Sequence, residues 1–232
     1  MISFDGVDIR SVAPVKIVDI LPSAVSLETT AKGRAITGGS DFVRTHDGSR
    51  TVSVSFAILE ENPIQRAMYM DALRRWAKRD AEYRLEIAFM PNMYLQAVCT
   101  GFPDHSIRQW WESGLQLTFT CFDNPYWTSK GEKSVACGTE FTVLGDAPPL
   151  MRIENTFDSS ASNQAYSDGT NTMTFSTIPA GNMVIDLNRQ TAVVGSSSIM
   201  QYYAYTSRFL LPKTGTQTIT GTGTVKYRER WV

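Results

Sequence analysis

Apolar and polar residues alternate with a period of two in several parts of this sequence, and this feature restricts its fold most. Val52–Ile58, Leu85–Phe89 and Leu115–Cys121 each place apolar side chains at every second position. The spacing is typical of half-buried antiparallel strands, in which successive side chains point to opposite faces of a sheet. We therefore expect a mainly β chain.

One segment has the spacing of a helix instead. Asn62 is a suitable N-cap, the proline after it suits the first helical position, and Gln65 completes a pair like a capping box. Lys78 and Arg79 lie near the C-terminal end, where the helix dipole favours cations. We predict one long helix over residues 63–80, whose buried face carries Tyr69, Met70, Leu73, Trp76 and Ala77.

The composition changes near the middle of the chain, because Thr, Ser and Gly become frequent from about residue 131. We place a domain boundary there, which gives an N-terminal domain of residues 1–130 and a C-terminal domain of residues 131–232. The polar stretch of residues 158–164 lacks a core-forming pattern and is interpreted as a surface loop.

Threonine occupies every second position from Thr214 to Thr224, and Lys226, Arg228 and Arg230 continue this pattern. A period of two over this length predicts extended strands with one hydroxylated or basic face, interrupted by a turn at residues 221–223. The opposite face carries Ile219, Val225, Tyr227 and Trp231. The C-terminal domain is therefore expected to be all-β, a sandwich or jelly roll.

Residues with catalytic chemistry are sparse. His46 and His105 are the only two histidines, so a zinc site with several imidazoles cannot form within one chain. No GxSxG, P-loop, GxGxxG or HExxH motif is present. A serine triad with His105 and a pair of glycosidase carboxylates remain as alternatives, but Asp186 is interpreted as a strand-end or turn residue. We predict no enzyme activity and no catalytic, cofactor-binding or metal-ligating residues.

Charge and cysteine content argue against a nucleic-acid-binding protein and against a disulfide-bonded framework. The 22 basic and 23 acidic residues give a net charge of -1, so neither a basic nucleic-acid surface nor an acidic tail dominates. Cys99, Cys121 and Cys137 are odd in number and widely spaced, so we expect free thiols, with Cys121 buried. No signal-peptide pattern or membrane-length apolar run is found, and the protein is expected to be soluble and made in a cytoplasm.

Two aromatic groups allow more than one interpretation. Exposed Trp110 and Trp111 could stack on a sugar or a base, and the same holds for the segment Tyr202–Tyr205. Core packing and subunit contact are favoured for the tryptophans, and strand packing is favoured for the tyrosines.

Short phrases along nearly the whole chain occur in the order and spacing of a known family. The sequence resembles the distal tail proteins of long-tailed, non-contractile phages, the siphophage tail component family. The phrases that carry the resemblance are Ile2–Asp8, Thr51–Phe56, Leu73–Ala77, Phe122–Tyr126, Pro149–Ile153, Met183–Asp186, Arg208–Pro212 and Val225–Trp231.

The resemblance implies an N-terminal β-sandwich-like domain with one helix, which closes into a homohexameric ring, and a C-terminal galectin-like jelly roll. The implied function is structural: a virion protein at the phage tail tip, made in the bacterial cytoplasm. The ring would join the tail tube protein to tail-tip or tail-associated proteins, with a receptor-binding protein as a further candidate partner. No cofactor, nucleic-acid contact or membrane insertion is implied. A carbohydrate-binding lectin and a jelly-roll glycosidase are the alternatives, because a fold alone does not decide function.

Overall fold

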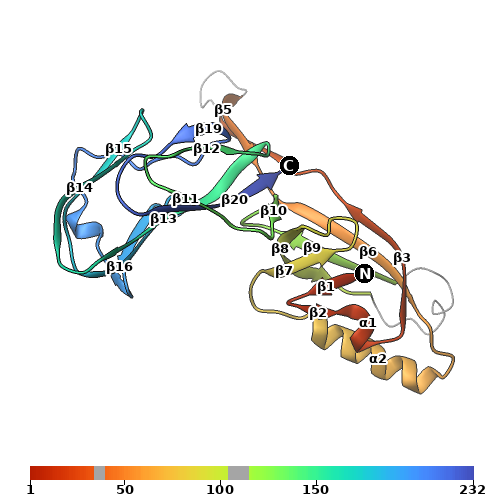
Figure 1. The fold of residues 1–232 in the computed structure, drawn as a ribbon. Coiled ribbons are helices and arrows are strands. Elements are labelled where there is room, and N and C mark those ends of the chain that lie inside the picture. Colours follow the sequence, from red (N-terminus) through yellow and green to blue (C-terminus); the bar gives the residue numbers. More distant parts are fainter. Residues whose placement is uncertain (34–39, 104–114) are drawn as a thin grey trace. The chain divides into compact units, whose positions relative to one another are not determined.

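A computed structural model describes residues 1–33, 40–103 and 115–232. The described chain forms two compact units, Met1–Trp127 and Thr128–Trp231, with Val232 counted in the first (Figure 1). Both units are built mainly from antiparallel strands, so the mainly β class is confirmed. Two α-helices occur among the described residues, α1 (Ile9–Val12) and α2 (Pro63–Ala77).

The described part of the first unit contains a sheet of antiparallel strands and a separate hairpin. In sheet order, the strands are β3 (Val15–Pro22), β6 (Arg50–Ile58), β9 (Leu115–Cys121), β8 (Met93–Gly101), β7 (Tyr83–Ile87), β1 (Ile2–Phe4) and β2 (Val7–Asp8). The hairpin pairs β4 (Leu27–Gly33) with β5 (Ser40–Asp47).

The three predicted strand patterns lie in this sheet. Every second residue of β6 is buried, and Val54 pairs with Leu117 of β9, where Phe119 and Cys121 continue the buried face. The prediction is wrong for Phe89, which is 53% exposed. The chain turns directly after β7, where the Met90 N–H donates to the Ile87 carbonyl, so Phe89 never joins the strand face.

Helix α2 begins as predicted and ends three residues early. The Asn62 side chain accepts hydrogen bonds from the N–H groups of residues 64 and 65, at 2.9 and 3.4 Å. The Asn62 N–H donates to the Glu60 carboxylate, so Glu60 takes the place that the sequence assigned to Gln65. Lys78 has an extended backbone and ends the helix. Arg79 donates to carbonyl oxygens of the last turn, as expected for a cation at this end.

The second unit encloses its own core between sheets. In sheet order, the largest described sheet contains β11 (Lys133–Ala136), β20 (Thr224–Trp231), β13 (Ala147–Phe157), β16 (Gly181–Asp186), β17 (Thr191–Val194) and β18 (Ser197–Ser198). Two further sheets pair β12 (Glu140–Val143) with β19 (Gly215–Thr218) and β14 (Ala161–Ser167) with β15 (Thr172–Ile178). The core draws buried residues from all three sheets. The strand β10 (Trp127–Ser129) spans the division between the units, and η1 (Met200–Tyr202) is a short 3-10 helix.

The period-two pattern near residue 220 is confirmed for its apolar face, and Arg230 departs from it on the basic face. Strands β19 and β20 flank bends at residues 221–223, and Ile219, Val225 and Tyr227 are buried. Arg230 is buried rather than exposed, and its guanidinium donates to the Pro148 carbonyl. The loop prediction for residues 158–164 holds for residues 158–160 and is wrong for residues 161–164, because β14 begins at Ala161. Backbone pairing with β15 holds this strand although few of its side chains are buried.

All three cysteines are free thiols, as predicted, and Cys121 is buried. Burial is the main cause that raises the pKa of the Cys121 thiol to about 12, with a smaller contribution from the Glu82 carboxylate. The thiol therefore acts as a small apolar side chain of the first core.

Candidate functional site

The histidines and tryptophans singled out in the sequence do not form a described site. The backbone of His46 lies in β5, opposite Glu28. His105, Trp110 and Trp111 lie outside the described residues. No group of three His, Cys, Asp or Glu side chains that could hold a metal ion occurs in the part of the chain that the structure describes. Within the same part, no helix is long and apolar enough to cross a membrane.

The predicted strand packing of the tyrosine segment holds for Tyr203, which forms an isolated β-bridge with Phe175 of β15, and is wrong for the rest of the segment. Tyr202 lies in η1, and Tyr205 is completely exposed. Tyr203 packs on Phe209 and on the edge of Phe175, with ring centroids 5.0 and 5.7 Å apart. The segment therefore contributes a core contact and one exposed ring, with no flat platform of several rings.

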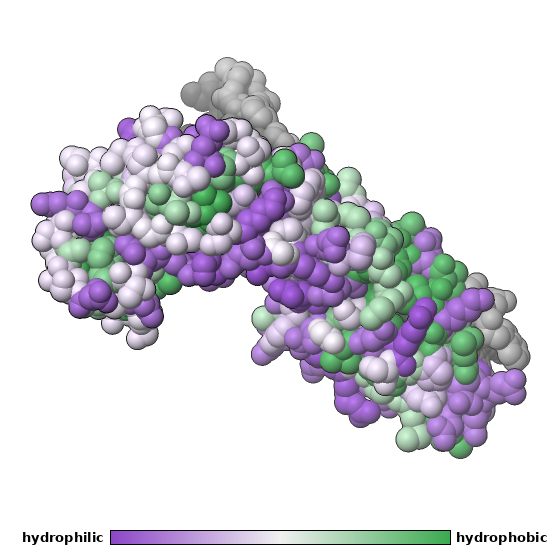
Figure 2. Space-filling view, in the orientation of Figure 1, coloured by the Kyte–Doolittle hydropathy of each residue, from purple (hydrophilic) through white to green (hydrophobic). Residues whose placement is uncertain are grey.

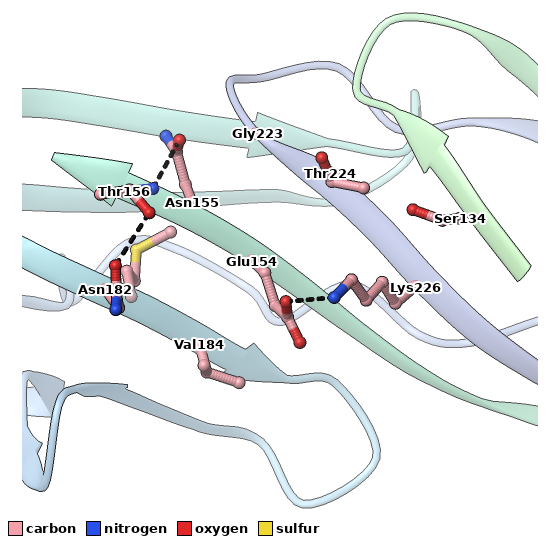
Figure 3. A pocket seen from close by; sticks show the side chains of 10 residues that line it. Ser134, Glu154, Asn155, Thr156, Asn182, Val184, Gly223, Thr224 and Lys226 are labelled. Atoms are coloured by element: carbon pink, nitrogen blue, oxygen red, sulfur yellow. Dashed lines mark hydrogen bonds and ion pairs between the residues drawn. The ribbon is translucent and has the colours of Figure 1, made fainter. Parts of the chain in front are cut away.

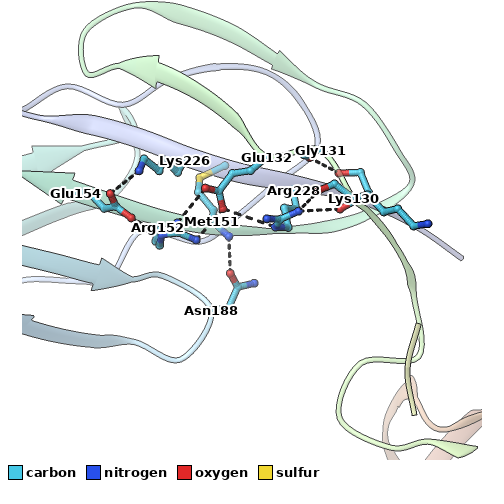
Figure 4. Close-up of polar contacts among 10 residues, drawn as sticks. Lys130, Gly131, Glu132, Met151, Arg152, Glu154, Asn188, Lys226 and Arg228 are labelled. Carbon is cyan, nitrogen blue, oxygen red and sulfur yellow. Dashed lines mark hydrogen bonds and ion pairs between the residues drawn. The ribbon is translucent and has the colours of Figure 1, made fainter. Parts of the chain in front are cut away.

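A chain of five alternating charges crosses the polar face of the largest sheet of the second unit (Figure 4). Arg152 of β13 donates through Nη1 and Nη2 to both carboxylate oxygens of Glu132, at 2.8 and 3.0 Å, and through Nε to Glu154 at 2.6 Å. Lys226 of β20 contacts the other oxygen of Glu154 at 2.7 Å, and Arg228 lies 3.6 Å from Glu132. The charges of neighbouring strands are thus paired across the ladder.

This pairing holds the Glu154 carboxylate in its charged form. The hydrogen bond from Lys226, followed by that from Arg152, holds the pKa of the Glu154 carboxyl below its usual value. The hydrogen bond to Glu154 raises the pKa of Arg152. A glycosidase acid needs the opposite shift, because it must carry a proton near neutral pH. Glu154 therefore suits binding or sheet stabilisation better than proton transfer.

Sequence reasoning missed this pair of acids. The alternation revealed the basic positions 226 and 228, but the acidic partners come from two other segments, Glu132 before β11 and Glu154 in β13. Only the strand register, in which Lys226 pairs with both Ser134 and Arg152, brings them together. Asp186 ends β16 and accepts hydrogen bonds from the N–H groups of residues 188 and 189, so its turn role is confirmed.

An open polar groove with a cavity volume of about 650 Å³ adjoins the charge chain (Figure 3). Its lining mixes hydroxyl, amide and paired charged groups with two apolar residues, Met183 and Val184. The Thr156 hydroxyl donates to the side-chain oxygen Oδ1 of Asn182 at 2.9 Å, which leaves the side-chain nitrogen Nδ2 of Asn182 available to a ligand. The main polar side chains are those of Ser134, Glu154, Thr156, Asn182, Thr224 and Lys226.

Exposed apolar side chains gather on the first unit (Figure 2). Fourteen large hydrophobic residues are exposed in the described chain, and ten of them lie between Met1 and Trp127. Single exposed hydrophobic residues are normal on a soluble protein, whereas clusters mark contact surfaces. The ten are Met1, Val7, Val18, Leu21, Leu27, Leu59, Ile64, Met68, Phe89 and Phe122.

Comparison with known proteins gives a match in structure. No protein-family model and no curated protein matches the chain. The crystal structure of SPP1 Dit (gp 19.1) is similar, with 14% sequence identity and a TM-score of 0.74 over 100% of this chain and 98% of that one. This chain has the fold of SPP1 Dit. That protein is described as a paradigm of the hub adsorption apparatus in phages that infect Gram-positive bacteria.

The likeness to Dit confirms, at the level of the fold, what the resemblance to phage distal tail proteins predicted. Two structures of the phage P2 baseplate in its activated conformation, with Ca and with Sr, are also similar. Their identities are 10% and 9%, their TM-scores 0.47 and 0.43, and each comparison covers 94% of this chain and 91% of the other.

Proposed function

We propose that this chain is a structural hub of a phage tail. In this proposal residues 1–130 close into a homohexameric ring that joins the tail tube to tail-tip and receptor-binding proteins. Residues 131–232 form a galectin-like domain outside the ring. The observation that carries the proposal is the match of the whole chain, in both units, to the hub protein SPP1 Dit. The role requires surfaces and no reacting groups, so the protein is proposed to catalyse nothing and to bind no cofactor.

The distribution of exposed apolar residues supports the division of labour between the units. A ring subunit buries surface on both sides, and such contacts are rich in apolar side chains. Ten of the fourteen exposed large hydrophobics lie between Met1 and Trp127. The assembled protein is proposed to reside at the tail tip of the virion, after synthesis in the bacterial cytoplasm.

The solution mass of the full chain tests the hub proposal. Six copies of the 25.8 kDa chain have a mass of about 155 kDa, which light scattering coupled to size exclusion measures directly. We expect this mass at micromolar concentration. A mass that stays at one copy over the accessible concentration range would contradict the ring.

The polar groove favours saccharide binding as a second candidate function. The Glu154 carboxylate is already fixed by two cations, and its remaining lone pairs can accept from sugar hydroxyls. Asn182 and Lys226 supply donors, and the ion pair leaves the groove close to neutral. This set of groups suits a neutral, hydroxyl-rich ligand better than a charged one.

Chemical-shift titration of the isotopically labelled chain with lactose, maltose and chitobiose tests this candidate. We expect at least one disaccharide to shift the amide signals of residues 154, 182 and 226, and Asn182→Ala to remove the effect. Asn188→Ala, in the turn between β16 and β17 and outside the groove lining, is the matched control. Signals that stay unchanged with all three sugars would exclude saccharide binding as a function of the groove.

A further inference from the structure

Two neighbouring valines lie on the polar face of the largest sheet of the second unit, beside the charge chain. Val184 of β16 and Val193 of β17 are directly opposite each other in the ladder, so their side chains point to the same face. Ile185 and Val194, the next residues along the two strands, pack into the core instead. Both valines are half-buried, and Val184 lines the polar groove. We call Val184 and Val193 the valine pair.

Polar groups with a fixed orientation flank Val184 on two sides. Glu154 of β13 is directly opposite Val184 in the ladder, and Asn182 precedes Val184 by two positions, so all three share one face (Figure 3). Two cations hold the carboxylate of Glu154, at 2.6 and 2.7 Å. The hydroxyl of Thr156 occupies Oδ1 of Asn182 at 2.9 Å, so Nδ2 is the group that Asn182 offers to a ligand.

This part of the groove therefore offers an acceptor, an apolar contact and a donor next to one another. A sugar hydroxyl satisfies the acceptor or the donor but gains nothing from the valine pair. An acetamido group uses all three, because its N–H donates to Glu154, its carbonyl accepts from Asn182 and its methyl packs on the valines. Glu154 and Asn182 occupy diagonal positions of the ladder, about 7–8 Å apart, and one amide with a hydrogen bond of about 2.9 Å at each end spans that distance.

We propose that the groove binds N-acetylated amino sugars, with the acetamido group on the valine pair. This inference rests on the saccharide binding proposed above for the same groove and names the class of sugar. The cavity volume of about 650 Å³ lies within the range of small-molecule sites, and the open groove leaves room for further sugar units. A neutral amide also leaves the ion pairs of Glu154 intact.

Two disaccharides that differ only in the acetamido group test the inference. Cellobiose and the N-acetylated form of chitobiose share the same linkage, and the second carries an acetamido group where the first carries a hydroxyl. In a chemical-shift titration of the full-length chain, we expect the N-acetylated sugar to shift the amide signals of residues 154, 182 and 184. Its affinity should exceed that of cellobiose by about tenfold or more, since a contact with one methyl group gives discrimination of this order.

Val184→Thr tests the apolar contact, because it keeps the branched shape of the side chain and replaces one methyl by a hydroxyl. The variant is expected to lose about tenfold in affinity for the N-acetylated sugar and to bind cellobiose as the wild type does. Val18→Thr, the same exchange at a 49% exposed position of β3 in the first unit, is the matched control and should change neither affinity. Far-ultraviolet circular dichroism checks that both variants keep the fold.

The outcomes separate the class of sugar from saccharide binding itself. Equal affinities for the two disaccharides, or binding of lactose or maltose without binding of the N-acetylated sugar, would overturn this inference and leave saccharide binding in place. A Val184→Thr variant that keeps its affinity, or that loses affinity for both sugars alike, would show that the acetamido group does not lie on the valine pair. If no sugar shifts the groove signals, both proposals for the groove fail, and the hub proposal still depends on the solution mass alone.

Discussion

Trp76 is the residue on which the first core depends most visibly. Its indole is 5% exposed, its N–H donates to Val7, and its ring meets the edges of Phe4 and Phe119 at centroid distances of 5.9 and 6.3 Å. Trp76→Ala is expected to lower the free energy of unfolding by about 3–5 kcal/mol, because it opens a cavity and leaves a carbonyl without its donor. Urea denaturation measures the loss.

Met68→Ala is the control for Trp76→Ala, because the side chain lies on the same helix but is mostly exposed. Its effect on the free energy of unfolding is expected to stay within about 0.5 kcal/mol. A loss below about 1 kcal/mol for Trp76→Ala would contradict the anchoring role of the indole.

At the residue scale, the sequence patterns correctly predicted the role of residues whose environment is set by neighbours close in the chain. The N-cap Asn62 and the buried thiol Cys121 are examples, because a cap and a strand face depend on neighbours within a few positions. The predictions for Phe89 and Arg230 are wrong because features outside the local pattern decide the positions of these side chains. A turn ends the alternation before Phe89, and a distant carbonyl accepts from Arg230, so continuing the period of two gave the wrong face.

At the scale of elements, the long helix and the strands with strong alternation were predictable, whereas β14 was not. Residues 161–167 carry mostly polar side chains, and their strand exists because β15 pairs with them. The candidate groove and the charge chain depend on register between β11, β20 and β13, which no local pattern encodes.

The ion pair between Glu154 of β13 and Lys226 of β20 should make the stability of the chain depend on pH. Glu154 has a lowered pKa in the folded chain, so its stabilising effect is present above its unfolded pKa of about 4.3 and is lost as the pH falls through its folded pKa. Glu154→Gln should therefore destabilise the chain at neutral pH, and the difference from wild type should shrink in acid. The effect is expected to be modest, since solvent screens the partly exposed pair.

Urea unfolding of wild type and Glu154→Gln over a series of pH values checks this dependence. Glu140→Gln, at an exposed position of β12 in the same unit, is the matched control and should change the stability little at every pH. A difference between Glu154→Gln and wild type that is the same at neutral and at acid pH would show that the carboxylate charge contributes nothing.

At the scale of the whole molecule, the mainly β class was predictable from the period of the sequence, and the resemblance led to the fold shared with SPP1 Dit. Which apolar residues point outward was not predictable. An apolar residue such as Ile64 is equally compatible with a buried and an outward position until the helix is placed on its sheet. The set of apolar side chains that remains exposed thus emerges only in three dimensions.

The strand pairings of the second unit also determine how it can fold. Strand β11 pairs with β20, and β12 with β19, so the ion pair between Lys133 and Glu229 joins positions 96 residues apart. Bringing such distant strands together costs loop-closure entropy before their contacts contribute any stability, and this slows folding. Strands near the beginning of the unit thus complete their ladders only with strands near its end, whereas β14 and β15 form a local hairpin, so the outer pairings cannot form before most of the unit has been synthesised.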